Sequence, residues 1–288
     1  MEFLSLRTFQ AVVEEGGILS ASRKLNTVQS NVTTRIKRLE EELGAELFYR
    51  RGRGLELAPS GKVLLDYARQ LLHLESLATT AVRQVGIQTG EIRIGAMETF
   101  AALRLPEALK GLRQVHAGLE LHIETNTSGY LIERILEHKL DCAFVGGVVD
   151  HPDISSYEVL QEELVVIRSK QAPKGQLPLI LFREGCAYRA RALTWQRECG
   201  YQTNEIMELG SLDAILGCVA VGLGCTLVPS WVVSQSRHRH EFIIEPVATH
   251  LAAVPTLMIR HTQAIPLKAL DTLARVVTTQ DLMNEVWE

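Results

Sequence analysis

The stretch SASRKLNTVQSNVTTRIKRLEEELGAELFYRRGRGLELAPSG, residues 20–61, decides the fold of the N-terminal part of the chain. Its central segment predicts a helix over residues 28–43 that ends at Gly44, and the Asn26-Thr27 pair offers a turn with an N-cap before it. Apolar residues recur there at intervals of three and four and predict one buried face, which consists of Val32, Ile36, Leu39 and Leu43.

The opposite face of this helix is polar and cationic. Acidic residues come only late in the helix, at residues 40–42. Side chains of these types read base edges and hold phosphates in a DNA groove, although a solvated helix surface carries the same types. The residues of this face are Gln29, Ser30, Asn31, Thr33, Thr34, Arg35, Lys37 and Arg38.

Two shorter helices are predicted before this one, at residues 4–15 and 18–25, and an arginine-rich hairpin after it. In the hairpin sequence RRGRGLEL, residues 50–57, Gly52 and Gly54 suit a tight tip. The hairpin arginines that can reach backbone phosphates are Arg50, Arg51 and Arg53. A polar helix followed by a basic hairpin predicts an all-α winged helix-turn-helix DNA-binding domain over residues 1–58.

Residues 59–88 predict one long helix that begins with Pro59, a residue favoured in the first turn. Its apolar residues alternate at three- and four-residue intervals, which is typical of a coiled-coil seam. We therefore expect residues 59–89 to form a linker and dimerisation helix; the alternative is a helix packed on its own domain. The seam residues are Leu64, Tyr67, Leu71, Leu74, Ala78, Ala81 and Val85.

Residues 90–288 alternate strands with helices and predict an α/β domain with a parallel sheet. The strands EIRIGA, LELHIET and DCAFVGG form a first series, and a second series, which includes LMIRH, follows before a helical pattern returns after Pro266. We expect a lobe I of residues 90–161 and 267–288 and a lobe II of residues 162–266. Two crossings between the lobes would form a cleft with a hinge.

Hydroxyl residues follow two strands of lobe I where helices begin. Thr99 follows EIRIGA, and Thr127 and Ser128 follow LELHIET. Helix starts present free N–H groups and partial positive charge, which favours a carboxylate or another small anion, unless these hydroxyls are ordinary N-caps. The further candidates for ligand contact are Gly146, Gly147, Arg183 and Cys225.

Composition excludes several classes of protein. The net charge of −4 argues against a protein that coats nucleic acid by bulk charge. The five cysteines lack CxxC spacing, so we expect no zinc site, no disulfide framework and a reducing cytoplasm. We also expect no other metal and no cofactor. The N-terminus lacks the pattern of a signal peptide, and glycines and a proline interrupt the uncharged stretch 214–236, so we expect no membrane helix.

The run from Leu6 and Phe9 through residues 20–61 resembles the LysR-type transcriptional regulators, and EIRIGA, LPEAL, KLDCAFVGG and VGLGCTLVP match the family more loosely. The resemblance implies a linker-helix dimer and an effector domain of two lobes, built like the type 2 periplasmic binding proteins. It implies a non-enzymatic regulator whose DNA bending changes when a small effector binds. Its implied partners are double-stranded promoter DNA, a small-molecule effector, a second copy as homodimer or homotetramer, and RNA polymerase.

The chain departs from the family pattern at two places. Ala58 stands where the family usually has a threonine that caps the linker helix, a loss of about 1 kcal/mol. Cys186 and Cys199 lie in the region where peroxide-sensing members carry reactive cysteines, but the sensing position falls on Ala187. A redox-sensing regulator is one alternative. A binding protein or enzyme on the two-lobed fold is weaker, since no nucleophile–base pair or HExxH motif is present.

Overall fold

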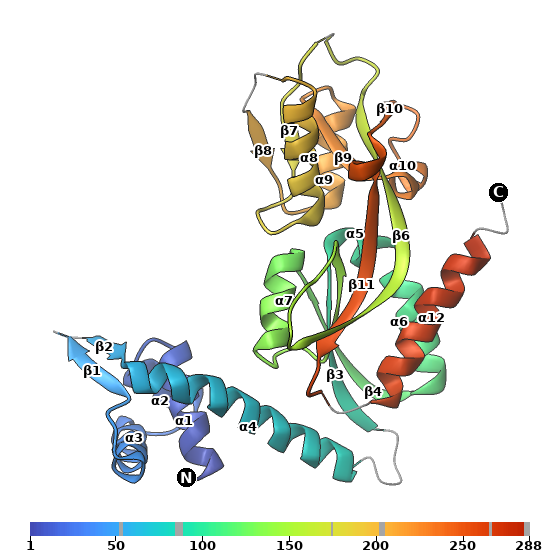
Figure 1. Ribbon diagram of the computed structural model, residues 1–288. Coiled ribbons are helices and arrows are strands. Elements are labelled where there is room, and N and C mark those ends of the chain that lie inside the picture. Colours follow the sequence, from blue (N-terminus) through green and yellow to red (C-terminus); the bar gives the residue numbers. More distant parts are fainter. Residues whose placement is uncertain (52–53, 84–88, 174, 202–204, 265–266, 285–288) are drawn as a thin grey trace. The chain divides into compact units, whose positions relative to one another are not determined.

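The computed structural model describes residues 1–51, 54–83, 89–173, 175–201, 205–264 and 267–284 (Figure 1). The chain divides into two compact units, Met1–Val85 and Gly86–Glu288, which are described separately below. Among the described residues, no helix combines the length and the apolar character needed to cross a membrane.

The N-terminal unit contains the predicted helices and hairpin in the predicted order. They are α1 (Phe3–Glu14), α2 (Ile18–Lys24), α3 (Gln29–Leu43), β1 (Phe48–Arg51), β2 (Gly54–Leu57) and α4 (Pro59–Arg83). Strand β1 pairs antiparallel with β2, with Arg51 opposite Gly54. The expected last turn of the long helix, at residues 84–88, lies outside the described residues.

The core of this unit forms between α1, α3 and α4. The Phe9 and Phe48 ring centroids lie 5.4 Å apart and join α1 to the hairpin. Leu43 is 42% exposed, so its predicted burial is wrong: it lies at the end of α3, where Gly44 turns the chain with a φ of +65°. The prediction of an N-cap at Asn26-Thr27 is also wrong. The N-cap residue of α3 is Val28, and no side-chain hydrogen bond caps the helix. The buried core residues include Leu6, Phe9, Val12, Val32, Ile36, Leu39, Leu64 and Ala68.

The C-terminal unit has two lobes (Figure 1). Lobe I contains β3 (Thr89–Ala96), α5 (Glu98–Leu103), α6 (Leu105–Val115), β4 (Gly118–Thr125), α7 (Ser128–Leu136), β5 (Cys142–Gly146) and α12 (Lys268–Asn284). Lobe II contains β7 (Leu179–Leu181), α8 (Ala187–Glu198), β8 (Ile206–Glu208), α9 (Leu212–Ala220), β9 (Cys225–Pro229), α10 (Ser230–Gln235), β10 (Phe242–Pro246) and α11 (Thr249–Ala252). Two long strands, β6 (Ile154–Ser169) and β11 (Ala253–His261), run from one lobe to the other.

The strands form a sheet in the order β4-β3-β5-β11-β6-β9-β7-β8, with β10 also paired to β6. Strand β3 is parallel to β4 and β5, and β7 is parallel to β8 and β9, as predicted. The crossing strands β6 and β11 pair antiparallel, which corrects the prediction of a wholly parallel sheet. The reason is topological: one strand leaves lobe I and the other returns to it.

The return to lobe I comes earlier in the chain than predicted. Strand β11 already pairs with β5 of lobe I from Thr256 to Ile259, so LMIRH does not belong to lobe II. The sequence shows a strand there but not its partner, because pairing with β5 is a contact between distant segments. At the cleft end of lobe I, the buried rings of Phe100 and Phe144 stack with centroids 4.2 Å apart and fix the start of α5 against β5.

Candidate functional site

Helix α3 turns a polar face to solvent, because Val32, Ile36 and Leu39 are buried against the core. Thr33 and Arg35 are half-buried at the edges of this face. The first turn of α3 has no acidic residue, so its free N–H groups and partial positive charge remain available to a phosphate. The predicted DNA-contact residues that are exposed are Gln29, Ser30, Asn31, Thr34 and Arg38.

The two threonine hydroxyls of α3 donate to its own backbone. The Thr33 Oγ1 donates to the Gln29 carbonyl at 2.9 Å, and the Thr34 Oγ1 donates to the Ser30 carbonyl at 2.8 Å. Each oxygen keeps acceptor capacity. Both hydroxyls can therefore accept a hydrogen bond from a base amino group, while their methyl groups can contact a thymine methyl.

The cations of α3 lie on two different sides. Lys37 lines a depression together with Thr33 and the hairpin residue Tyr49. Arg35 and Arg38 line a second depression, next to the N-terminal residues of the chain. From the sequence, Lys37 was expected on the polar face of α3 but not among the DNA contacts, and only the tertiary structure places it beside the hairpin.

Glu40, near the end of α3, has a structural role. Its Oε1 accepts the backbone N–H of Leu47 at 2.8 Å and that of Phe48 at 3.4 Å. The carboxylate therefore ties the start of the hairpin to α3. Of the predicted hairpin contacts, Arg53 lies outside the described residues, and Arg50 and Arg51 lie on β1 with their side chains outside the description.

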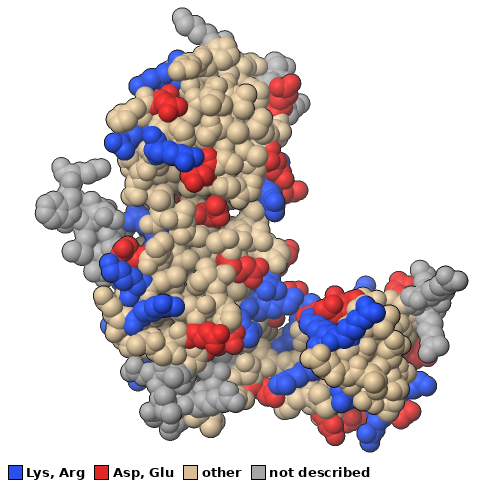
Figure 2. Space-filling model, turned by 180° about the vertical axis from the view of Figure 1, so that it is seen from behind, with Lys and Arg blue, Asp and Glu red and all other residues tan. Residues whose placement is uncertain are grey.

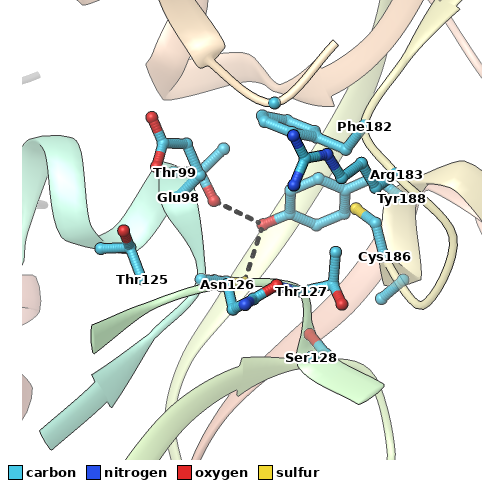
Figure 3. Close-up of a pocket in the computed structure, with 13 residues that line it drawn as sticks. Glu98, Thr99, Thr125, Asn126, Thr127, Ser128, Phe182, Arg183, Cys186 and Tyr188 are labelled. Atoms are coloured by element: carbon cyan, nitrogen blue, oxygen red, sulfur yellow. Dashed lines mark hydrogen bonds between the residues drawn. The ribbon is translucent and has the colours of Figure 1, made fainter. Parts of the chain in front are cut away.

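A cavity of about 120 Å³ lies between the two lobes of the C-terminal unit (Figure 3). Helices α5 and α7 of lobe I and α8 of lobe II all begin at its wall. The two helix starts predicted from the sequence thus meet at one cavity, and lobe II supplies a third. The lining residues are Met97, Glu98, Thr99, Thr125, Asn126, Thr127 and Ser128 of lobe I, and Phe182, Arg183, Cys186, Ala187, Tyr188 and Gly210 of lobe II.

The predicted hydroxyl residues of the cleft have different surroundings. The Thr99 hydroxyl is buried and lies 3.3 Å from the Tyr188 hydroxyl. The Ser128 Oγ accepts the backbone N–H of Gly146 at 3.0 Å, which ties α7 to the end of β5. Thr127 is the N-cap of α7 and forms no side-chain cap hydrogen bond. Thr127 is therefore the hydroxyl of the α7 start that is best placed to meet a ligand.

Three other predicted ligand contacts do not line the cleft. Gly146 and Gly147 use their backbone N–H groups internally, the latter by donating to the Pro255 carbonyl at 2.8 Å. Gly147 has a φ of +90°, a conformation that favours glycine. Cys225 lines a separate cavity of lobe II with Trp195 and Tyr201. The two glycines follow the end of β5 without lining the cleft, and Cys225 lies at the other cavity.

Two charged side chains line the cleft, Glu98 from lobe I and Arg183 from lobe II (Figure 3). Neither forms a hydrogen bond or an ion pair within the described part of the chain. A Cβ at Gly210 would lie 3.3 Å from the Arg183 Nη2, so the glycine leaves room for the guanidinium group. The cleft therefore offers one unpaired cation and one unpaired anion to a ligand.

Beneath the cleft, the Tyr188 hydroxyl donates to the carboxylate of Glu162 on the crossing strand β6. Burial raises the pKa of this carboxyl group to about 7, while hydrogen bonding from Tyr188 lowers it. Glu162 was not among the site residues expected from the sequence. A signal was present, since the alternation of β6 places Glu162 on the same face as the buried Leu160 and Leu164.

The two cysteines of the redox alternative lie at opposite ends of α8. Cys186 is its N-cap and Cys199 its C-cap, and a helix of 12 residues spans about 18 Å. A disulfide needs Cα atoms within about 7 Å, so this pair cannot bond while α8 is folded. Burial also raises the pKa of the Cys186 thiol, which disfavours the reactive thiolate.

Among the described residues, no group of His, Cys, Asp and Glu side chains has the arrangement of a metal site. On the visible face of the C-terminal unit, basic (blue) and acidic (red) side chains of the described residues are mixed, and neither sign forms a broad area (Figure 2). This distribution agrees with the net charge of −4. Local chemistry, and not bulk charge, therefore distinguishes the two candidate sites.

Comparison with known proteins identifies both units. Residues 3–62 match the model of the bacterial regulatory helix-turn-helix proteins of the lysR family, and residues 86–281 match the LysR substrate binding domain. The chain belongs to the LysR family. This LysR-family chain is a transcriptional regulator with a DNA-binding unit and an effector-binding unit.

A similar relative is the HTH-type transcriptional regulator YusT of Bacillus subtilis (strain 168), 37% identical over 276 residues that cover 94% of each chain. A full-length OxyR variant from Pseudomonas aeruginosa has a similar fold, with a TM-score of 0.70, 20% identity and coverage of 96% of this chain and 94% of that one. Full-length CbnR in complex with its target DNA gives a TM-score of 0.65 at 22% identity, with coverage of 97% and 99%. These structures support the fold of this LysR-family regulator.

Proposed function

We propose that this regulator binds promoter DNA through α3 and the β1–β2 hairpin, under the control of a small carboxylate that binds between the lobes. The observation that carries the proposal is the convergence of three helix starts and the unpaired Arg183 on one cavity between lobes joined by two strands. A ligand held by both lobes changes their spacing, and the crossing strands β6 and β11 form the hinge.

The chemistry of the cleft selects the ligand. Arg183 and the helix starts favour a carboxylate, and an Arg–carboxylate pair is bidentate and strong. Glu98 stands on the opposite wall, so a ligand with negative charge at both ends would meet repulsion there. A carboxylate whose other end carries an ammonium group or another donor fits best.

The proposal extends to partners and location. Exposed apolar residues on α4 suit contact with a second copy of the chain, and a dimer of dimers would bind two neighbouring DNA sites and bend the DNA between them. RNA polymerase is the further partner of such a complex. Because the proposed target is DNA, we assign the protein to the cytoplasm, as a regulator without enzymatic activity.

Thermal-shift and calorimetric titration of the full chain tests the ligand class. The panel consists of acetate, succinate, 2-oxoglutarate, glycine and glutamate, each against sodium chloride at equal ionic strength. We expect an amino-carboxylate to bind most tightly, and Arg183→Ala to weaken its binding at least tenfold, because one charge-assisted pair is lost. Glu184→Ala, an exposed neighbour that does not line the cleft, is the control. Equal loss in both variants would contradict the assignment of Arg183.

DNase footprinting on the DNA that flanks this protein's own gene tests regulation. It is carried out with and without the ligand that the titrations identify. We expect a long protected region with hypersensitive sites that shortens or shifts when the ligand is added. Protection no better than on random DNA of the same length would contradict sequence-specific binding there, and genome-wide mapping would then locate the targets.

Salt dependence tests the DNA surface. Lys37→Ala should weaken binding to all sequences alike and reduce the slope of log K against log salt by about 1, because one phosphate contact is lost. Charge removal at Arg51 should act in the same way. Lys110→Ala, an exposed lysine of the C-terminal unit, is the matched control and should leave the slope unchanged. Loss of discrimination without loss of affinity would show that Lys37 reads bases instead.

A further inference from the structure

Glu162 is a carboxyl group buried where the two lobes join. It lies on β6 at the end of the segment that pairs with β11, and the pairing with β9 of lobe II begins at Leu164. Its side chain is 1% exposed. A buried carboxylate is costly unless other groups compensate its charge, so the groups that face Glu162 decide its protonation state.

Side chains from both lobes face this carboxyl group. They are Tyr188 and Cys186 at the start of α8, Arg104 between α5 and α6, Trp231 on α10 and Thr256 on β11. Arg104 carries the one permanent charge of this set, and its guanidinium group lies 4.9 Å from the centroid of the Trp231 ring. The hinge thus brings donors of both lobes, and a single cation, to one buried acid.

The hydrogen bonding around Glu162 is incomplete. Its Oε1, the Trp231 Nε1 and the Thr256 Oγ1 are buried, and none of the three has a hydrogen-bond partner of good geometry among the described residues. Only the Tyr188 hydroxyl is engaged, with the other carboxylate oxygen. Burial accordingly raises the pKa of Glu162 to about 7, against the lowering effects of Tyr188, Thr256, Trp231 and Arg104.

A chain of hydroxyls connects this acid to the cleft. When Glu162 is ionised, the Tyr188 O–H donates to it. Thr99 must then donate to the Tyr188 oxygen over 3.3 Å, the contact between these two side chains that Figure 3 marks. When Glu162 carries a proton, its O–H can donate to Tyr188. The Tyr188 proton can then turn to the Met97 Sδ at 3.7 Å or to Thr99, and the Thr99 O–H is released toward the cleft.

We propose that Glu162 is a positioning residue of the cleft: the proton that it exchanges with solvent sets the direction of the Glu162–Tyr188–Thr99 hydrogen-bond chain, and a carboxylate ligand binds with uptake of one proton at Glu162. The second part rests on the proposed function. Protonation removes a negative charge from beneath the ligand and releases one donor toward it, so both effects favour an anion.

The first part is tested without any ligand. Trp231 faces Glu162, so the tryptophan fluorescence of the full chain should report its ionisation between pH 5.5 and 8.5. We expect one transition near neutral pH in the wild-type protein and its loss in Glu162→Gln. In Tyr188→Phe the transition should persist with a higher midpoint, because the hydrogen bond that favours the carboxylate is removed.

Glu163→Gln is the matched control, because Glu163 is the exposed neighbour on the same strand and loses the same charge. Its transition should match the wild type. A transition that survives in Glu162→Gln, or no transition in the wild type, overturns the proposal. Circular dichroism verifies folding, and if Glu162→Gln does not fold, the midpoint shift of Tyr188→Phe decides.

The second part is tested by calorimetric titration with the tightest binder of the carboxylate panel, in phosphate and in Tris at pH 7.5. Proton uptake makes the observed enthalpy differ between the buffers, and Glu162→Gln should abolish the difference. Binding without proton uptake overturns the second part but leaves the proposed function intact. If no panel member binds, the proposed ligand class and the uptake both fail, while the fluorescence titration still decides the role of Glu162.

Discussion

Gly61 lies in the first turn of α4, where backbone of the preceding segment passes very close. A Cβ at this position would lie 2.3 Å from the Leu47 carbonyl oxygen and 2.6 Å from the Leu57 Cδ1. Because the first of these is a backbone atom, the clash cannot be relieved by turning a side chain. The absence of a side chain at Gly61 therefore fixes the join between the hairpin and the long helix.

Gly61→Ala should destabilise the N-terminal unit by about 1–3 kcal/mol, as overpacking of a tight contact does. Differential scanning calorimetry of the full chain measures the loss. Gly217→Ala in α9 is the contrasting control, since a Cβ there meets nothing within 4 Å and alanine favours the helix by up to about 1 kcal/mol. Equal effects of the two changes would contradict the steric argument.

At the scale of the element, some apolar residues of α4 pack against the core of the N-terminal unit and others are exposed to solvent. Leu64 is 9% exposed and belongs to the core of the N-terminal unit, and the half-buried Leu71 packs against that core. Tyr67 is 61% exposed and Leu74 54% exposed, and Ala78 is exposed as well. The seam expected from the sequence is thus partly a contact with the helix's own domain, and Tyr67, Leu74 and Ala78 remain the proposed dimer contacts. The side chain of Ala81 lies outside the described residues.

Leu74→Lys should raise the dimer dissociation constant at least tenfold, because a charge replaces an apolar side chain in the proposed helix–helix contact. Sedimentation equilibrium over a range of concentrations measures the constant. Thr79→Lys adds the same charge to an exposed position about 140° further around the helix. If both variants dimerise equally well, α4 does not use this face.

At the scale of the C-terminal unit, two buried titrating groups act on stability in opposite directions. Glu162 has a pKa of about 7 against 4.5 for an exposed glutamate, because burial disfavours its charge. Burial likewise disfavours the charged form of His261 and lowers its pKa; its ring centroid lies 4.0 Å from that of His138. Glu162 therefore stabilises the folded state more at low pH, and His261 stabilises it more at high pH.

The contribution of Glu162 to the free energy of unfolding is fully present below pH 4.5 and is lost as the pH rises through about 7. The reason is that the folded state keeps the proton up to a higher pH than the unfolded state does. Its full size is about 3 kcal/mol. Glu162→Gln should consequently raise the midpoint temperature of unfolding relative to wild type at pH 8 more than at pH 5. Scanning calorimetry at both values measures this, with Glu163→Gln as control, and a constant difference between the two pH values would contradict it.

The His261 contribution is present above pH 6.5 and is lost as the pH falls toward the lowered folded-state pKa. In His261→Gln the unfolding temperature should therefore decrease less between pH 7 and pH 5 than it does in the wild type. Unfolding temperatures at half-unit pH steps provide the test. His240→Gln, an exposed histidine, should leave the acid limb of the profile unchanged; an equal effect there would assign the acid sensitivity to general charge repulsion.

The sequence by itself determined the elements of the DNA-binding unit, the polar face of α3 and the position of helix starts after β3 and β4. Helix periodicity, hairpin glycines and strand-to-helix order are local patterns, and each can be read within a few turns of chain. For the same reason the winged helix-turn-helix and the family resemblance could be inferred from residues 6–61 alone.

Only the tertiary structure decided which residues meet. Thr99 and Tyr188 are 89 positions apart, and Tyr188 and Glu162 26 apart, so no local pattern joins them. The charge state of Glu162, the place of Cys225 in a separate cavity and the division of the α4 seam follow from burial against distant segments. Burial and strand pairing depend on contacts between segments that are distant in the sequence. These contacts exist only once folding has brought the segments together, so local patterns in the sequence do not show them.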